Sequence, residues 1–211
     1  MEHRIAAIEA GTEPELFWLL EHPPTYTAGT SASKDELLDA GDIPVFETGR
    51  GGRYTYHGPG QRVIYALCDL RKRDRDLRAH VARLEEWIIR TLAAFDIKGE
   101  RRKGRVGIWV APNMTNDLSA SGGGAPSLMP QTNSSNTNHS EQKIAAIGVR
   151  VRRWIAYHGL ALNVNPDLAP FQGIVPCGLP DFGVTSMHKL GGKVSMQEVD
   201  KEFKEQMKEV F

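Results

Sequence analysis

Apolar residues recur at helical spacing over one long segment near the middle of the chain. Between positions 77 and 95 they fall three or four residues apart, at Leu77, Val81, Leu84, Ile88, Leu92 and Phe95. This spacing places them on one face and predicts an amphipathic helix. A second amphipathic helix is predicted from about Gln197 to Phe211, where the apolar stripe consists of Val199, Phe203, Met207 and Val210.

Shorter apolar runs bounded by glycine, proline or polar residues predict strands. The first run, at 16–20, ends before His22 and two prolines and is expected to form a buried strand. Further strands are predicted at 44–48, 54–56, 62–67, 106–110, 144–151 and 154–164. Two short helices complete the pattern, one closed by Gly11 and one over 33–40 with Ser33 as its cap. Because strands and helices mix without a regular βαβ alternation, the predicted fold class is α+β.

One segment, Thr115 to Gln142, has a different composition from the rest of the chain. It is rich in serine, asparagine, glycine and threonine and nearly free of large apolar residues. Such a segment cannot bury enough surface to offset the entropy lost on ordering, so we predict a flexible surface insertion at about 115–142. The 211 residues otherwise suffice for one core, which predicts a single domain over 1–211.

Composition excludes several classes of function. The 26 basic and 26 acidic side chains cancel, which argues against a nucleic-acid partner. The sequence contains no apolar run long enough to span a bilayer and no signal-peptide pattern, so we expect a cytoplasmic protein without a membrane partner. Scattered histidines and the lack of paired CxxC motifs argue against structural zinc.

The densest candidate site is the glycine-rich stretch from Arg50 to Gln61. Glycines at 51, 52, 58 and 60 permit close approach of the backbone, and they flank a predicted strand that ends at His57. One interpretation is the edge of a ligand pocket; the other, equally supported, is two hairpin turns around an ordinary strand. The stretch does not match GxxxxGK[ST] or GxGxxG, so the common nucleotide-phosphate fingerprints are absent from it.

Two further residues suggest nucleophilic chemistry. Cys177 lies between a proline and a glycine, on a constrained turn where backbone N–H groups can face an oxyanion. Cys68 lies within an apolar strand and is better explained as a small buried hydrophobe; a free thiol pair is favoured over a disulfide. Lys143 opens a strand of small apolar residues, where partial desolvation would favour its basic form. On the residues alone a solvated lysine is favoured, and the imidazoles of His57 and His158 are rival bases.

Five blocks of the sequence, taken in order, resemble one family. They are Glu21-His22-Pro23-Pro24 with Tyr26-Thr27, Arg50-Gly-Gly-x-x-Thr55-Tyr56-His57-Gly-Pro-Gly-Gln61, Lys143-Ile-Ala-x-x-Gly148, His158-Gly-Leu-Ala-Leu-Asn163 and Pro176-Cys177-Gly178. The set closely resembles the lipoyl(octanoyl) transferases, which move octanoyl from acyl carrier protein to lipoyl domains. The resemblance covers almost the whole chain outside 115–142.

This resemblance implies a fold and a set of roles. The implied fold is a mixed, mainly antiparallel sheet with flanking helices, shared with biotin and lipoate protein ligases. Cys177 matches the family's acyl-accepting nucleophile and Lys143 its partner lysine. Because the incoming thioester is already activated, the family needs no metal or nucleotide cofactor. The implied substrate-binding residues are Arg50, Gly51, Gly52, Arg53, Tyr54, Thr55, Tyr56, His57, Ala146, Ile147, Gly148, Gly159, Leu160 and Ala161.

The resemblance also implies partners: octanoyl-acyl carrier protein as donor, and as acceptors the lipoyl domains of 2-oxoacid dehydrogenases and the glycine cleavage H protein. Two features depart from the family pattern. The chain opens inside its first helix, so we expect part of an N-terminal helix to be missing, and the stretch before Lys143 is unusually long. Alternatives within the same fold are an ATP-dependent lipoate–protein ligase and a lipoyl-domain amidotransferase. A catalytically silent module that binds lipoyl domains is the alternative from another class.

Overall fold

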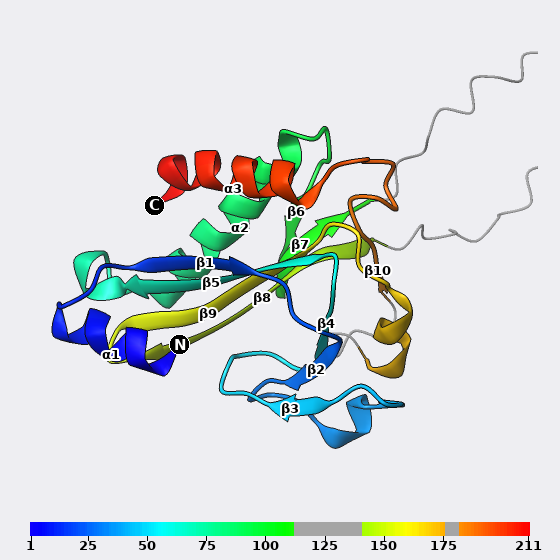
Figure 1. Cartoon of the computed structure of the whole chain (residues 1–211), viewed down its shortest axis with the longest axis horizontal. Helices are drawn as coiled ribbons and strands as arrows, with labels where there is room; N and C mark the ends of the chain where they lie inside the picture. The colour runs from blue at the N-terminus through cyan, green and yellow to red at the C-terminus, as the bar shows by residue number, and fades with distance from the viewer. Residues whose placement is uncertain (112–140, 176–181) are drawn as a thin grey trace, which may run out of the picture.

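A seven-stranded sheet forms the centre of the computed structural model, which describes residues 1–111, 141–175 and 182–211 (Figure 1). The strands run in the order β1 (Leu16–Leu20), β5 (Gln61–Asp69), β9 (Ile155–Asn163), β8 (Gln142–Arg152), β7 (Arg105–Val110) and β6 (Glu100–Arg102), with β10 (Gly183–Val184) beside β8. All neighbours pair antiparallel except β10, which is parallel to β8. This confirms the predicted α+β class with a mainly antiparallel sheet.

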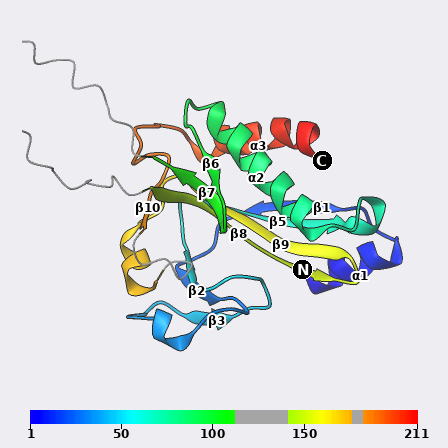
Figure 2. The same cartoon turned by 180° about the vertical axis from the view of Figure 1, so that it is seen from behind.

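A small second sheet and the helices cover parts of the two faces. The small sheet has the order β3 (Val45–Glu47), β2 (Thr25–Ala28) and β4 (Thr55–His57). The helices are α1 (Glu2–Ala10), α2 (Leu77–Ala93) and α3 (Met196–Val210), with 3-10 turns η1 (Lys34–Glu36), η2 (Leu70–Lys72) and η3 (Ala169–Gly173). Figure 1 and the reverse view in Figure 2 show α2 and α3 on one side of the main sheet and α1 and the small sheet on the other.

The face beneath α2 and α3 carries the main core. Alternate residues of β5, such as the fully buried Ile64, point towards Trp87 of α2 and Phe203 of α3. The Trp87 indole N–H donates a hydrogen bond of 2.7 Å to the Phe203 carbonyl, and the two rings meet edge to face at 5.1 Å. This contact joins the two predicted amphipathic helices to each other as well as to the sheet.

In the described part of the chain, one cluster covers each end of the opposite face. At one end α1 packs Ile5 and Ile8 against Leu67, Ile155 and Tyr157. At the other end the small sheet forms its own apolar cluster with η3, made of Tyr26, Ala28, Tyr54, Tyr56, Phe171 and Ile174. Among the described residues, the sheet surface between these two clusters therefore faces a cavity.

Most predicted elements are confirmed, with two corrections. The first helix ends at Gly11, whose φ of 75° is the left-handed C-cap expected there. The predicted helix at 33–40 is instead the single 3-10 turn η1, because the following backbone N–H groups of Leu38 and Asp39 bond the Gly173 carbonyl. The strand at 16–20 is an edge strand rather than a buried one, with Trp18 48% exposed.

Several other expectations have a defined outcome. Cys68 is fully buried, as expected, and burial raises the pKa of its thiol to about 12. The sequence pattern missed β2, β6 and β10. Of the insertion predicted at 115–142, the structure describes only Glu141 and Gln142, the latter being the first residue of β8; the rest lies outside the described residues. No helix within the described ranges is both long and apolar enough to cross a membrane.

His80 provides a test of the core. It lies fully buried on α2, and burial lowers its pKa to about 4. Neither ring nitrogen has a hydrogen-bond partner among the described residues. We expect His80→Leu to raise the free energy of unfolding by about 1 kcal/mol at neutral pH, because an unsatisfied buried polar group is removed.

The pH dependence of this effect has a defined sign. The folded-state pKa of His80 lies below its unfolded value of 6.5, so wild-type stability falls as the pH drops from about 6.5 towards about 4. The stabilisation by His80→Leu should therefore grow over that range in urea titrations. The same change at the exposed His3 should leave stability unaltered; an equal effect at both positions would contradict the burial argument.

Candidate active site

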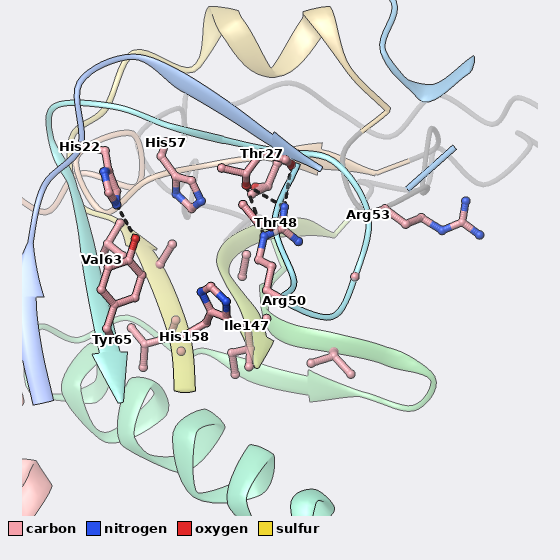
Figure 3. A pocket seen from close by; sticks show the side chains of 18 of the residues that line it. His22, Thr27, Thr48, Arg50, Arg53, His57, Val63, Tyr65, Ile147 and His158 are labelled. Carbon is pink, nitrogen blue, oxygen red and sulfur yellow. Dashed lines mark hydrogen bonds between the residues drawn. The ribbon is translucent and has the colours of Figure 1, made fainter. Parts of the chain in front are cut away.

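A cavity of about 880 Å³ occupies the open part of the main sheet, between the main sheet and the small sheet (Figure 3). Its floor is built from β5, β8 and β9. Small residues pair between β8 and β9, where Ala146 lies opposite Ala161 and Gly148 lies opposite Gly159. With no large side chain at these four positions, the floor forms a narrow apolar trough.

The roof of the cavity is more polar than the floor. Side chains alternate along the small sheet, so Thr25, Thr27, Thr55 and His57 face the cavity. The intervening tyrosines face the opposite way, into the cluster with η3. The cavity is therefore an amphipathic slot, with an apolar floor and a roof of hydroxyl and imidazole groups.

Arg50 fixes the loop that follows β3 against this roof. Its Nη2 donates to the Thr27 carbonyl at 2.6 Å and to Thr27 Oγ1 at 2.8 Å, and Nη1 donates to the Gly51 carbonyl at 3.0 Å. A Cβ atom at Gly148 would lie 3.0 Å from Arg50 Cδ. The absence of a side chain at Gly148 thus lets the guanidinium stem lie directly over the floor.

Imidazole and phenol groups gather at one end of the slot. His22 Nε2 lies 2.7 Å from the Tyr65 hydroxyl, and the His22 and His57 rings are 5.7 Å apart (Figure 3). Burial lowers the pKa of His57 and of His158 to about 4, and it lowers that of His22 as well. All three imidazoles are neutral at physiological pH. His158 also has a φ of 60°, a strained conformation for a residue with a side chain.

Lys143 lies on the same cavity, near the start of β8. It is only 8% exposed, and its Nζ lies 5.3 Å from the centre of the Trp109 ring. Gly107, with a φ of 110°, lies beneath its side chain; a Cβ there would be 2.6 Å from Lys143 Cε and 2.5 Å from the Ala145 carbonyl oxygen. The Lys143 stem is therefore positioned by one aromatic ring and one glycine of β7.

A cation–aromatic stack packs against Trp109, the ring that lies near Lys143 Nζ. The Arg105 guanidinium lies 4.5 Å from the Trp109 ring and 4.3 Å from the Phe182 ring. Its Nη2 donates to Glu141 at 2.6 Å, which neutralises the charge. Trp109 is 1% exposed and so has little freedom to leave Lys143.

The structure places twelve of the predicted site residues around the cavity. They are Arg50, Gly52, Arg53, Thr55, His57, Lys143, Ala146, Ile147, Gly148, Gly159, Leu160 and Ala161. Tyr54, Tyr56 and Gly51 do not line it; Tyr56 instead contacts Tyr26 and Phe171 edge to face. For the two tyrosines the reason is the two-residue alternation along β4, which sends neighbouring side chains to opposite faces. Cys177 lies outside the described residues.

Other lining residues were not predicted to bind substrate. They include His22, Thr48, Val63, Tyr65, Arg105 and the exposed apolar pair Phe46 and Val106. Alternation along β5 is the signal that could have found Tyr65, since it lies two residues after Val63 and opposite Gly159. Of the others, Val63 also lies on β5, Arg105 and Val106 lie at the start of β7, Phe46 lies on the edge strand β3, and His22 and Thr48 lie in loops.

The turn at 71–75 is basic, with Arg71, Lys72, Arg73 and Arg75 interrupted by Asp74. In the structure Arg71 bonds Asp69 at 2.8 Å and the carbonyl of Glu9, at the end of α1, at 3.0 Å. Arg73 is paired with Glu15. These two side chains thus tie α1 and the start of β1 to the turn, which favours a structural role for them.

Comparison with known proteins identifies the family. Residues 1–208 match the family described as lipoyl protein ligase A/B catalytic domain. The octanoyltransferase of Paramagnetospirillum magneticum is 56% identical over 211 residues, covering all of this chain and 88% of that protein. The octanoyltransferase of Chelativorans sp. is 54% identical, covering all of this chain and 79% of that protein.

Solved structures show the same fold at low identity. A lipoate-protein ligase A bound with ATP has a TM-score of 0.64 at 17% identity, over 94% of this chain and 73% of that one. A bipartite lipoate protein ligase from Thermoplasma acidophilum has a TM-score of 0.67 at 15% identity, over 99% and 79%. The fold and the sequence match define a catalytic domain of the lipoyl protein ligase A/B class. Within that class the chain belongs to the octanoyltransferases, a family of acyltransferases.

The packing of Lys143 on Gly107 gives a prediction. We expect Gly107→Ala to lower acyl-transfer activity by at least about tenfold, because the new methyl group must displace the lysine stem. Gly191 offers a matched control: its φ is 93°, but a Cβ there meets no atom within 4 Å. Both variants should lose some stability through backbone strain, measured by thermal unfolding. Equal activities at matched temperature would contradict a positioning role for Gly107.

Proposed function

We propose that this protein transfers an octanoyl group from octanoyl-acyl carrier protein to the lysine of lipoyl domains. The acyl group passes through a thioester on Cys177, and the acceptors are the lipoyl domains of 2-oxoacid dehydrogenases and the glycine cleavage H protein. The reaction takes place in the cytoplasm. The observation that carries the proposal is the slot itself, an apolar trough of small residues with Lys143 at one end.

The shape of the trough suits an unbranched acyl chain. Between Lys143 and Gly148 the floor follows β8 for five residues, roughly 16 Å at the usual rise of a strand. This length exceeds that of an eight-carbon chain. Each methylene group buried there contributes roughly 0.8 kcal/mol, which is enough to prefer octanoyl over much shorter groups.

The position of the chain on either side of Cys177 supports the assigned nucleophile. On one side the Val175 N–H donates to the Glu36 carbonyl at 2.8 Å. On the other side Phe182 packs on Trp109, with ring centres 5.3 Å apart, and Val184 lies opposite Lys143 in the pair of β10 with β8. The described residues on either side, Val175 and Phe182, are therefore held in place, and Phe182 contacts the same Trp109 ring that lies near Lys143 Nζ.

In the proposed mechanism Lys143 first accepts the thiol proton of Cys177. The thiolate attacks the thioester carbonyl of the donor, a new thioester forms on Cys177, and the pantetheine thiol leaves with a proton returned by Lys143. The lysine amine of the acceptor then attacks the acyl-enzyme, Lys143 removes its proton, and the Cys177 thiol is released as the amide forms. Because one thioester replaces another before the amide is made, the sequence of steps needs no ATP.

An ATP-dependent ligase with the same fold is the nearest alternative. It would activate a free acid, so ATP with free octanoate would support transfer to a lipoyl domain. An amidotransferase would instead prefer an octanoylated lipoyl domain as donor. A binding module would retain lipoyl domains without any thiol-dependent transfer. A donor series with and without ATP separates the four functions.

The role of Cys177 can be tested by intact mass spectrometry. Incubation with octanoyl-acyl carrier protein should add one octanoyl group to the wild type, as a thioester that hydroxylamine cleaves. The Cys177→Ser variant should gain no such thioester. Cys68→Ala is the matched control and should still be labelled, because the Cys68 thiol is buried and its pKa is raised to about 12. A wild type without an adduct, or an undiminished adduct in Cys177→Ser, would refute the mechanism.

The trough predicts how chain length is selected. Ala161→Leu should fill the floor between β9 and β5 and displace two or three methylene groups of the substrate. We expect kcat/KM for the octanoyl donor to fall roughly 30-fold, equivalent to about 2 kcal/mol of lost burial. The butanoyl donor should change far less. Ala6→Leu, on the exposed side of α1, is the control; equal losses for both donors in Ala161→Leu would argue against the trough.

A further inference from the structure

A chain of buried amide groups connects His57 with the interior of the main sheet. His57 Nδ1 lies 2.6 Å from Gln61 Oε1, and Gln61 Nε2 lies 2.9 Å from Asn163 Oδ1. Asn163 Nδ2 in turn lies 2.9 Å from the Thr185 carbonyl. Gln61 and Asn163 are 2% and 4% exposed, and they do not line the 880 Å³ cavity. Both close sequence blocks singled out above, yet the proposed function gives them no task.

Two backbone carbonyls fix the direction of every hydrogen bond in this chain. A carbonyl can only accept, so the atom of Asn163 that faces Thr185 must be its amide nitrogen. The amide oxygen of Asn163 then faces Gln61. The nitrogen of Gln61 donates to this oxygen and also to the Tyr56 carbonyl at 3.2 Å. With its nitrogen committed twice, Gln61 presents its oxygen to His57.

This polarity determines the tautomer of His57. Gln61 Oε1 can only accept, so the proton of the neutral imidazole must lie on Nδ1. The second nitrogen, Nε2, then carries a lone pair, and it has no hydrogen-bond partner within the described part of the chain. The His57 ring belongs to the roof of the cavity and lies between His22 and Arg50 in Figure 3.

We propose that Gln61 and Asn163 are positioning residues that hold His57 as a fixed hydrogen-bond acceptor for an N–H group of the substrate. This inference rests on the proposed function, in which two N–H groups enter the slot: an amide of the donor's pantetheine arm and the amine of the acceptor lysine. His57 orients one of them with Nε2.

The surroundings make proton removal by His57 unfavourable. Burial lowers the pKa of His57 to about 4; the hydrogen bond to Gln61 opposes this shift, and the nearby charge of Arg50 adds to it. An imidazole that binds a proton so weakly is a poor base at neutral pH. It remains a good acceptor, because a hydrogen bond needs only the lone pair. The lowered pKa of His57 therefore argues against His57 as the base.

The tautomer can be measured directly by long-range 1H–15N NMR of histidine-labelled protein. His188 provides an internal reference, since its Nε2 lies 2.8 Å from the Val194 carbonyl and must carry the proton. At pH 7.5 we expect His57 to be protonated on Nδ1 and His188 on Nε2. In Gln61→Met only the His57 pattern should change. A wild-type His57 protonated on Nε2, or on both nitrogens, would overturn the proposal whether or not the variant folds.

Rate measurements then identify which N–H group His57 accepts. Three reactions are measured for Gln61→Met and for the wild type, at a temperature where both are folded. The first is loading of Cys177 from octanoyl-pantetheine, and the second is loading from an alkyl octanoyl thioester that has no amide. The third is aminolysis of the acyl-enzyme by a lipoyl domain. If the donor amide is bound, the first reaction should slow about tenfold and the second should not. If the acceptor amine is bound, the third should slow about tenfold.

The remaining outcomes refute the positioning role. Equal slowing of all three reactions would indicate a general structural defect. If neither the first nor the third reaction slowed, His57 would have no substrate partner. Either result overturns the proposal. A wild-type protein that is never loaded would instead refute the proposed function. In that case the NMR measurement still decides the tautomer, so the two failures are distinguishable.

Discussion

The alternation of side chains along the main sheet is the constraint on which the rest of the structure depends. Each central strand supplies the hydrophobic core with one set of residues and the cavity with the other. On β5, Val63 and Tyr65 line the cavity while Ile64 is fully buried beneath the helices. A register shift of one residue would exchange the two sets. The burial of the core under α2 and α3 therefore also fixes which residues face the substrate.

The open part of the sheet exists because its two ends are covered by different structures. At one end α1 packs on Leu67, and at the other the small sheet packs on η3, with the Tyr26 hydroxyl donating a 2.5 Å hydrogen bond to the Pro170 carbonyl. Arg50 joins the roof to the floor, since its guanidinium bonds Thr27 while its stem lies over Gly148. The dimensions of the slot thus depend on one arginine and on the small residues beneath it.

The sequence was most informative where a single element determines its own pattern. Helical spacing was sufficient to predict α2 and α3, and Gly11 marked the end of α1 through its positive φ. The local sequence was insufficient at 33–40, where a helix was expected, because the N–H groups of Leu38 and Asp39 bond the carbonyl of Gly173, more than 130 residues away. The hydrophobic pattern also missed β6, because its three residues are all charged; one of them, Arg102, forms a salt bridge with Glu141.

The candidate site shows the same division between local and distant information. Motif blocks predicted twelve of the lining residues, but they could not separate Thr55 and His57, which face the cavity, from Tyr54 and Tyr56, which face away. The facing direction depends on pairing with β2. The contact of His22 with Tyr65 joins residues 43 positions apart, so no local pattern could reveal it.

The neutral histidines of the slot and the lysine at its end serve different physical requirements. A charged imidazole in the roof would bring solvent into the slot and would oppose the burial of an acyl chain, whereas a neutral one offers a directional lone pair at little electrostatic cost. In the proposed mechanism Lys143 exchanges protons, and its contacts with Gly107 and Trp109 restrict the position of its stem. In these proposals Gln61 positions the acceptor His57, and β7 positions the proton-transfer group Lys143. Each group can therefore be positioned without altering the other.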